Sequence, residues 1–383
     1  MTSLLSIDMS SLTLPLDDID STHLDLDACI RQTSVSVSSS QQDSVPKAHR
    51  KQFKRVLKAH KTAVLKRIKR IDMMGSCVQL PRLSYKTRVT MLETLRNLPQ
   101  PEQRSPEWYA QRDRMITASD FGKALKSEKA RESFAKEKAK PIFDRLECEA
   151  KDIEYIRPLR RTGGRACQHG IMFEPVCDLI YRNLCRPGAV TEEFGLLPHP
   201  SIEYLGASPD GICNALSSET SMVGRLVEYK APISRVIQQG LVPEAYMAQM
   251  QGQLEVTGLD ECDYLECSLR LVEESVAKAL VGSEHHPPEA YGLIIAYTPS
   301  GEDTPTYVYG PYNRIDDEAA FAMLDDSCIP NEADVMYWIL DTYQLATLRR
   351  NQGWWQTTLG PSLASVWSRV IDLSHKNKHA LKK

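Results

Sequence analysis

Two carboxylates and a lysine fall at the ends of two strand-like segments near the middle of the chain. Asp210 stands in a Pro-Asp-Gly turn within "EYLGASPDGIC", and "RLVEYKAP" carries Glu228 and Lys230. Side chains two apart on a strand share a face, so Glu228 and Lys230 point the same way, while Tyr229 points away and leaves its backbone carbonyl available. Carboxylate and carbonyl oxygens are ligands that Mg²⁺ prefers, and an adjacent ammonium stabilises developing negative charge. This set predicts metal-dependent hydrolysis of a phosphodiester.

The amino-acid composition indicates which class of protein would position the two carboxylates and the lysine. Apolar residues make up 42% and charged residues 25% of the 383 residues, which is usual for a globular protein with a sizeable core. No apolar run approaches the roughly 20 residues of a membrane span, and the N-terminus lacks the layout of a secretory signal. Ten cysteines occur without a Cys-x-x-Cys pair, which favours reduced thiols in the nucleus or cytoplasm over disulfides or a zinc site.

Charge and complexity divide the chain into four expected segments. Residues 1–46 are rich in Ser and Asp without periodicity, which predicts a disordered extension. Residues 47–84 form a basic helical arm and linker, with eleven Lys or Arg and no acid in 47–70, while the rest of the chain has fourteen more acids than bases. This arm is either a solvated helix packed on the domain or a phosphate-binding or nuclear-import segment. Residues 85–350 form the main domain, and 351–383 a helical, basic tail.

The pattern of elements in the main domain predicts an α/β fold with a mixed central sheet flanked by helices. We expect a helix over "SPEWYAQRDR" and, after a break at "ITAS", a second helix capped by Ser119. Helical patterns follow over 123–150, 164–184, 243–259, 316–326 and 330–350. Strand patterns lie near 190–197, 203–208 and 223–230 and over "CDYLECSL", "AYGLIIAY" and "TYVYGP".

An Asp…Glu-x-Lys pattern alone is weak, but further stretches accompany it in order. "WYAQRDRMITASD", "HGIMFEPVCDLIY", "GASPDG", "VEYKAP" and "YMAQMQGQLEVTG" together span about residues 105–258. In order and spacing they resemble the motifs of the lambda-exonuclease/YqaJ-type viral recombinase family of the PD-(D/E)xK nucleases. The resemblance implies the restriction-endonuclease-like version of the α/β fold. It does not cover the N-terminal extension or the C-terminal segment with "GWWQTTLGPSLASVW", whose tryptophans we expect to pack internally.

The resemblance assigns a role to each acid of the predicted site. Asp210 and Glu228, with the Tyr229 carbonyl, would be the principal metal ligands. Glu174, on the helix of the second motif, would be a further metal or water ligand; a lone helix glutamate is otherwise usually solvent-exposed. Lys230 would be the catalytic cation, which orients or deprotonates the attacking water or neutralises the transition state.

The resemblance also implies residues that bind the substrate and support the lysine. Gln249 would hydrogen-bond Lys230 or the water, with Tyr246 one turn earlier shaping the pocket; the alternative for Gln249 is a polar helix-face residue. Arg112 and Ser119 match positions that bind a terminal 5′-phosphate, although a surface salt bridge would equally explain Arg112. Trp108 is expected in the core rather than at the wall of a DNA site.

The activity that the resemblance implies is a Mg²⁺-dependent deoxyribonuclease, with Mn²⁺ able to substitute, that acts as an exonuclease on double-stranded DNA ends in recombination or repair. A structure-specific endonuclease with the same site and a non-catalytic DNA-binding protein are the alternatives. The family also admits a homo-oligomer and a single-strand annealing protein as partners, and no membrane partner is expected.

Overall fold

The computed structural model describes residues 81–103, 105–155, 164–284, 287–301, 304–316, 318, 329 and 333–380. The chain divides into a unit of residues 1–81 and a unit of residues 82–383, and all the described residues except Pro81 belong to the second. The predicted extension (1–46), nearly all of the basic arm (47–84) and almost all of the expected helix 316–326 therefore lie outside the described residues.

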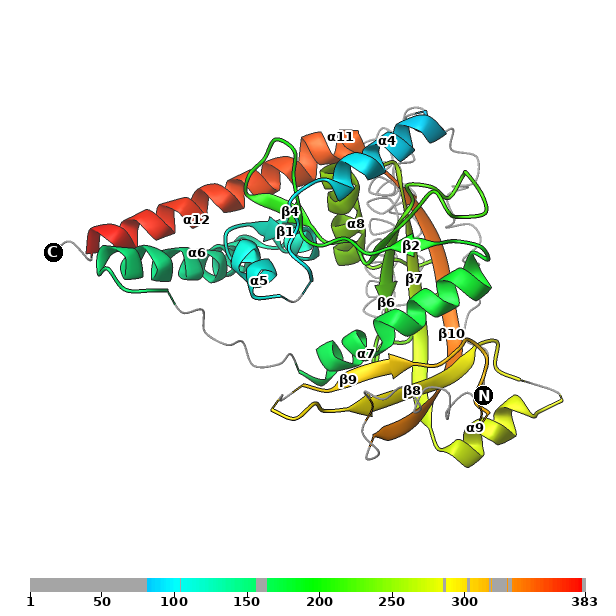
Figure 1. Cartoon of the computed structure of the whole chain (residues 1–383). Helices are drawn as coiled ribbons and strands as arrows, with labels where there is room; N and C mark the ends of the chain where they lie inside the picture. Colours follow the sequence, from blue (N-terminus) through cyan, green and yellow to red (C-terminus); the bar gives the residue numbers. More distant parts are fainter. Residues whose placement is uncertain are drawn as a thin grey trace, which may run out of the picture. The chain divides into compact units, whose positions relative to one another are not determined.

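The described chain contains both helices and strands, in runs of one to five consecutive elements of a kind (Figure 1). The helical segments are α4 (Tyr85–Arg96), α5 (Pro106–Arg112), the 3₁₀ helix η3 (Ala118–Leu125), α6 (Glu128–Ala150), α7 (Arg165–Ile180), the π turn η4 (Tyr181–Cys185), α8 (Glu244–Thr257), α9 (Glu274–Val281), α11 (Gln352–Trp354), the π turn η5 (Trp355–Leu359) and α12 (Gly360–Ala380). The strands are β1 (Ile116–Thr117), β2 (Thr191–Glu192), β3 (Leu197–Pro198), β4 (Leu205–Ala207), β5 (Gly211–Cys213), β6 (Leu226–Lys230), β7 (Glu261–Val272), β8 (Tyr291–Tyr297), β9 (Thr306–Tyr309) and β10 (Asp334–Arg349).

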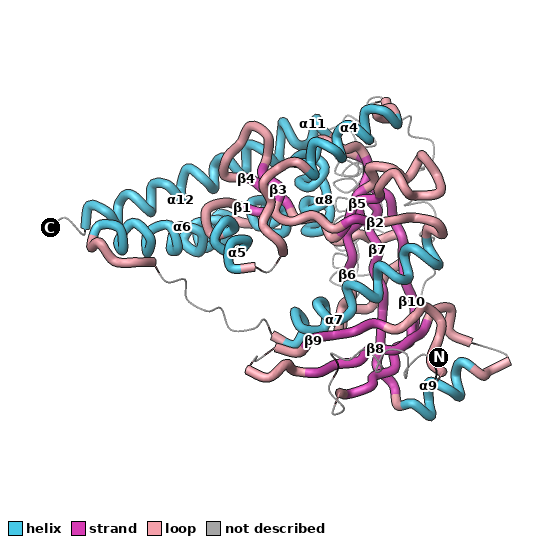
Figure 2. The backbone as a smooth tube through the Cα atoms, in the orientation of Figure 1, coloured by secondary structure: helices cyan, strands magenta, loops and turns pink. Residues whose placement is uncertain are grey.

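The strands form a central sheet of seven and a small sheet of three (Figure 2). The order of the large sheet is β2-β5-β6-β7-β10-β8-β9, in which β6 and β7 are parallel and the other neighbours antiparallel. The small sheet has the order β1-β4-β3. The predicted fold class, a mixed central sheet flanked by helices, is confirmed.

Helices α7 and α8 cover opposite sides of β6, as the alternation of its side chains requires. Val227 and Tyr229 belong to the buried cluster that includes Phe173 and Val176 of α7. Glu228 points the other way, toward the glutamines of α8 that contact it. One strand therefore has an apolar face that anchors α7 and a charged face that meets α8.

The expectation of a helix over residues 330–350 is wrong, because residues 334–349 form strand β10. This strand pairs antiparallel with β7 along twelve positions and with β8 along six. Its sequence "DVMYWILDTYQLATLR" is rich in aromatic and β-branched residues, which prefer strands. An apolar run of this length suits either a helix or a strand buried on both faces, and pairing with two neighbours decides for the strand.

One local expectation near the site, the cap at Ser119, also needs correction. Ser119 does not cap the second helix: η3 begins after Thr117, which makes no side-chain capping bond, so Ser119 lies in its first turn. The strand beside β6 is β5, directly after the Pro-Asp-Gly turn, whereas β4 before that turn belongs to the small sheet. Gly211 pairs with Val227, which places Asp210 beside the charged end of β6.

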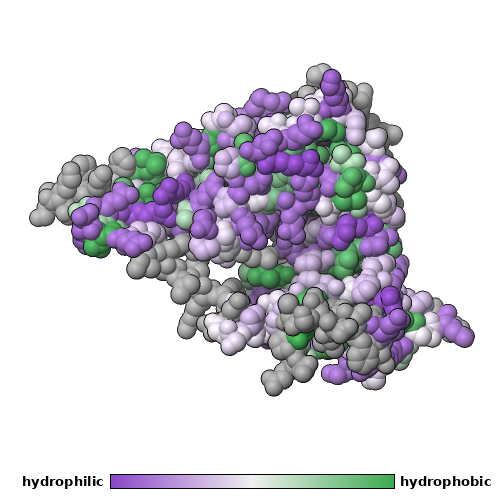
Figure 3. Space-filling model, in the orientation of Figure 1, coloured by the Kyte–Doolittle hydropathy of each residue, from purple (hydrophilic) through white to green (hydrophobic). Residues whose placement is uncertain are grey.

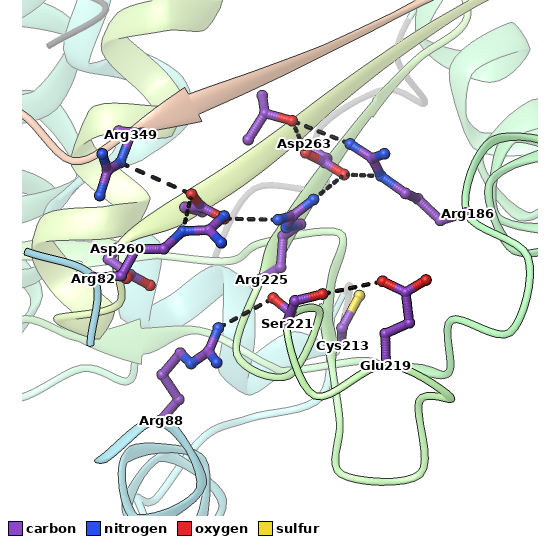
Figure 4. Close-up of polar contacts among 12 residues, drawn as sticks. Arg82, Arg88, Arg186, Cys213, Glu219, Ser221, Arg225, Asp260, Asp263 and Arg349 are labelled. Carbon is purple, nitrogen blue, oxygen red and sulfur yellow. Dashed lines mark hydrogen bonds and ion pairs between the residues drawn. The ribbon is translucent and has the colours of Figure 1, made fainter. Parts of the chain in front are cut away.

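A buried ionic network holds the opposite end of β6 to β7 (Figure 4). Arg225, just before β6, bonds Glu261 at 2.7 Å and Asp263 at 3.4 Å, and both acids lie on β7. Arg186 donates to Asp263 at 2.9 Å, and Arg82 pairs with Glu261. Because removing one partner would leave an uncompensated charge, this network fixes the two strands together.

The C-terminal segment packs against the rest of the second unit. Helix α12 runs along α6, and Arg369 pairs with Glu128 between them (Figure 1). Trp354 and Trp355 are buried, and Trp367 stacks on Tyr204 with the two ring centres 4.9 Å apart. The predicted internal packing of the three tryptophans is therefore confirmed.

The exposed face in Figure 3 is mostly hydrophilic, with hydrophobic side chains in small separate groups. The described cysteines are free, and Cys262 and Cys267 are buried in the sheet. Among the described residues, no helix has both the length and the apolarity needed to cross a membrane.

The approach of α8 to η3 depends on a glycine. A Cβ added at Gly252 would lie 2.3 Å from the ring of Phe121, which is fully buried. We expect Gly252→Ala to lower the free energy of unfolding by about 1–3 kcal/mol through overpacking. Gly170→Ala is the matched control, because no other atom lies within 4 Å of the position that its methyl group would take and alanine favours the α7 helix. Equal stability of the two variants in urea denaturation would contradict this packing.

Candidate active site

The predicted site residues lie around one cavity of about 800 Å³. Its lining includes Glu174 of α7, Asp210 of the turn, Glu228 and Lys230 of β6, and Gln249 of α8. Four elements that are distant in sequence therefore bring three acids, an amine and an amide to one place. Tyr229 and Tyr246, also expected at the site, line the same cavity.

The carboxylate of Glu228 is fully buried and hydrogen-bonded on both oxygens. Its Oε1 accepts from Gln249 Nε2 at 2.6 Å and from the Lys230 ammonium, and its Oε2 accepts from Gln253 Nε2 at 2.6 Å. A buried carboxylate is tolerated when charge and donors of this kind compensate it. The expected bond of Gln249 thus goes to Glu228 rather than to Lys230 or a water.

Asp210 is oriented by the backbone of β6, since its Oδ2 accepts from the Tyr229 N–H at 2.7 Å. Its pKa is raised well above the usual aspartate value, first by burial and then by the negative charge of Glu228. Lys230 opposes this shift, and Glu174 adds to it. Glu228 and Glu174 therefore both lie close enough to Asp210 to repel its charged form.

The Lys230 ammonium lies among the oxygens expected to bind metal. It donates to Glu228 Oε1 and, at 2.9 Å, to the Tyr229 carbonyl, and it lies 5.2 Å from the ring centre of Tyr246. Burial alone would lower its pKa, but Glu228 and Asp210 outweigh burial and raise the pKa above the usual lysine value. The lysine therefore keeps its proton at neutral pH.

The donor set suits a hard divalent cation by its chemistry. Two to three carboxylates and a carbonyl supply oxygen ligands, and mutual repulsion of the acids would be relieved by a second positive charge. Within the described residues, however, no three His, Cys, Asp or Glu side chains are grouped as a metal site. In this arrangement the Lys230 ammonium holds Glu228 and the Tyr229 carbonyl, two of the expected ligands.

Another part of the cavity wall carries three bases and three acids: Arg112, Lys123, Lys138, Asp113, Asp120 and Glu137. Arg112 donates to Ser119 Oγ at 3.2 Å, and its guanidinium lies 4.3 Å from the ring centre of Trp108. The two residues expected at a terminal phosphate thus lie together, and Trp108 lines the cavity instead of the core, contrary to expectation. Lys138 of α6 also lines the cavity and bonds Asp120 at 3.0 Å; burial lowers its pKa.

Comparison with known proteins matches this region to a family. Residues 107–260, which include Arg112, Glu174, Asp210, Lys230 and Gln249, match the family model of the YqaJ-like viral recombinase domain. This segment resembles the YqaJ-like viral recombinase domain and is referred to as the YqaJ-like domain. The resemblance expected from the motifs is therefore confirmed.

Individual proteins that resemble this chain share under a third of its residues in the aligned regions. An uncharacterized protein, R354, of Acanthamoeba polyphaga mimivirus is 29% identical over 258 residues; the match covers 63% of this chain and 43% of the relative, so the chain spans under half of that protein. Two crystal structures of an alkaline exonuclease from Laribacter hongkongensis, one in complex with dAMP, are 18% identical. They match 73% of this chain and 98% of theirs, with a TM-score of 0.42.

A hydrogen bond behind β6 ties the two acid-bearing elements of the YqaJ-like domain together. The Tyr229 hydroxyl donates to Asp178 Oδ1 at 2.8 Å, and Asp178 lies one turn after Glu174 on α7. Thr191 and Arg182 hold the same carboxylate, at 2.6 and 2.7 Å. Tyr229 does point away from Glu228 and Lys230, and its side chain fixes the helix that carries the third acid.

Gln253 is the residue that the sequence analysis of the YqaJ-like domain missed. It is fully buried and bonds Glu228, whereas Gln251 donates to the Arg349 carbonyl at 2.7 Å and accepts from the Asn351 N–H. The signal was present: residues four apart share a helix face, so the face of Gln249 continues to Gln253 and not to Gln251.

The raised pKa of Asp210 gives a test of the YqaJ-like site that needs no substrate. The folded state binds this proton more tightly than the unfolded chain, so the unfolding free energy contributed by Asp210 falls as pH rises from about 4 toward the raised pKa. We expect Asp210→Asn to be more stable than wild type in metal-free buffer at pH 7.5 and less sensitive to pH between 4 and 7.5, by thermal denaturation. Asp341→Asn, at an exposed acid, is the control. A lower midpoint for Asp210→Asn than for wild type would contradict the repulsion among these acids.

Proposed function

We propose that this protein is a divalent-metal-dependent deoxyribonuclease that hydrolyses phosphodiester bonds of duplex DNA from its ends. The observation that carries the proposal is the convergence of Glu174, Asp210, Glu228 and Lys230 on one cavity within a YqaJ-like viral recombinase domain. Separate structural roles would not require Glu174 and Glu228 to lie where they raise the pKa of Asp210.

Each residue of the site would have a distinct role in the reaction. Asp210 and Glu228, with Glu174 and the Tyr229 carbonyl, would hold Mg²⁺ or, in its place, Mn²⁺. The bound ion supplies a Lewis acid for the phosphate oxygen and a more acidic water. Lys230 keeps its proton, so it would donate a hydrogen bond and positive charge to the reacting phosphate rather than act as a base. Gln249 would act by holding Glu228.

The position of Arg112 in the cavity wall supports action at an end. Arg112 has a forked donor already braced by Trp108 and Ser119, which suits a terminal 5′-phosphate. Such a site would make the reaction start at duplex ends, whereas an endonuclease with the same acids would not need it. We extend the proposal to duplex DNA ends as substrate, to a homo-oligomer and a single-strand annealing protein as partners, and to a reducing nuclear or cytoplasmic compartment.

The first test is digestion of end-labelled linear duplex DNA over a titration of Mg²⁺. We expect release of nucleotides that depends on Mg²⁺ and falls by about 10²–10³-fold in Lys230→Ala, which removes the charge at the reacting phosphate. Asp341→Asn, on the far part of β10, should keep wild-type activity. Wild-type protein that binds DNA but leaves it intact at every Mg²⁺ concentration would favour the non-catalytic alternative.

The second test distinguishes an exonuclease from an endonuclease. We expect linear duplexes with a 5′-phosphate to be digested at least about tenfold faster than 5′-hydroxyl duplexes, because one charged hydrogen-bonded contact is worth about 1.5–3 kcal/mol. Arg112→Ala should abolish the difference, while Arg114→Ala, an exposed arginine outside the cavity lining, should retain it. Cleavage of closed circular DNA at a rate similar to linear DNA would support the endonuclease.

A further inference from the structure

Gln253 makes a contact that the predicted site did not include. It lies on α8, one turn after Gln249, and both amides donate to the carboxylate of Glu228, to Oε2 and Oε1 respectively, each at 2.6 Å. Gln253 has no exposed surface, so the contact excludes water. Its own Oε1 has no hydrogen-bond partner among the described residues.

The chemistry of the carboxylate sets which end of the amide faces it. An ionised carboxylate only accepts hydrogen bonds, so Nε2 of Gln253 must point at Glu228 and Oε1 must point elsewhere. Leaving Oε1 of a buried amide without a partner costs free energy. Gln253 therefore leaves its Oε1 in an unfavourable environment while its Nε2 holds Glu228.

Two amides on opposite oxygens restrict the carboxylate more than one would. With Gln249 alone, the group could turn about its terminal torsion, which is a soft and broad rotation. With both, the plane of the carboxylate is fixed relative to α8, and each oxygen retains a lone pair for a further contact. Lys230 already uses one of these on Oε1.

We infer that Gln253 is a positioning residue that holds Glu228 in the orientation in which it binds the catalytic metal. The inference builds on the proposed function, because it assigns to Glu228 a metal that the proposed reaction requires. Residues that orient metal ligands typically change metal affinity or activity about 10–100-fold when they are removed. Gln253 never contacts the substrate in this account and acts through Glu228.

The test is a comparison of Gln253→Met with Gln251→Met. Both replace a buried glutamine of α8 by a side chain of similar length without an amide, but Gln251 bonds the backbone of Arg349 and Asn351 instead of Glu228. Mn²⁺ without DNA is titrated calorimetrically into each folded protein. We expect Mn²⁺ binding to weaken by about tenfold or more for Gln253→Met and to stay unchanged for Gln251→Met.

Kinetics give a second readout. Gln253→Met should need more Mg²⁺ for half-maximal activity, with an unchanged KM for DNA, because the DNA-binding wall is intact. If Gln253→Met does not fold, Gln253→Ala, which inserts no new atoms, takes its place. Wild-type Mn²⁺ affinity and Mg²⁺ requirement in the folded variant would overturn the inference while the nuclease proposal stands; a wild-type protein that neither binds Mn²⁺ nor cleaves DNA would overturn both.

A double-mutant cycle with Glu228→Gln separates positioning from a general structural role. If Gln253 acts through Glu228, Gln253→Met should change Mn²⁺ affinity less than about twofold in the Glu228→Gln background, since the group it holds is already lost. A loss of the same size in both backgrounds would show that Gln253 acts independently of Glu228 and would overturn the inference.

Discussion

The buried negative charge of Glu228 is the constraint around which this part of the molecule is arranged. A carboxylate with no exposed surface is strongly unfavourable unless donors and a positive charge compensate it. Lys230 supplies the charge from the same strand, and Gln249 and Gln253 supply donors from α8. The packing of α8 on the sheet and the electrostatics of the site are therefore inseparable.

The alternation of side chains along β6 positions the remaining parts of the site. Its backbone N–H at Tyr229 orients Asp210, its charged face carries Glu228 and Lys230, and its other face directs the Tyr229 hydroxyl to Asp178 on α7. Because Glu174 lies one turn from Asp178, a single strand fixes the relative positions of all three acids. The parallel pairing of β6 with β7 and the ionic network at Arg225 hold that strand in register.

The sequence predicted the acids, the lysine and the fold class because these depend on local patterns: a Pro-Asp-Gly turn, strand alternation, and motifs in a fixed order. The prediction from sequence was wrong where pairing between strands that are distant in sequence determines the secondary structure. Residues 334–349 form a strand because β7 and β8 flank them; the aromatic and β-branched residues of the run favour a strand, but its length also suits a helix. Gln253 was within reach of helical periodicity from Gln249. By contrast, the position of Trp108 beneath Arg112 depends on how α5 meets the cavity, and this follows only from tertiary structure.

The central claim is that the acids of this cavity bind one kind of ligand, a divalent cation, in place of contacts now made by Lys230. The most direct measurement is anomalous diffraction at the manganese edge from crystals equilibrated with Mn²⁺. The account predicts a peak coordinated by Asp210 and Glu228, with the Lys230 ammonium moved off at least one of the oxygens it now contacts. Well-ordered acids with no manganese between them, at a Mn²⁺ concentration that supports DNA cleavage in solution, would contradict it.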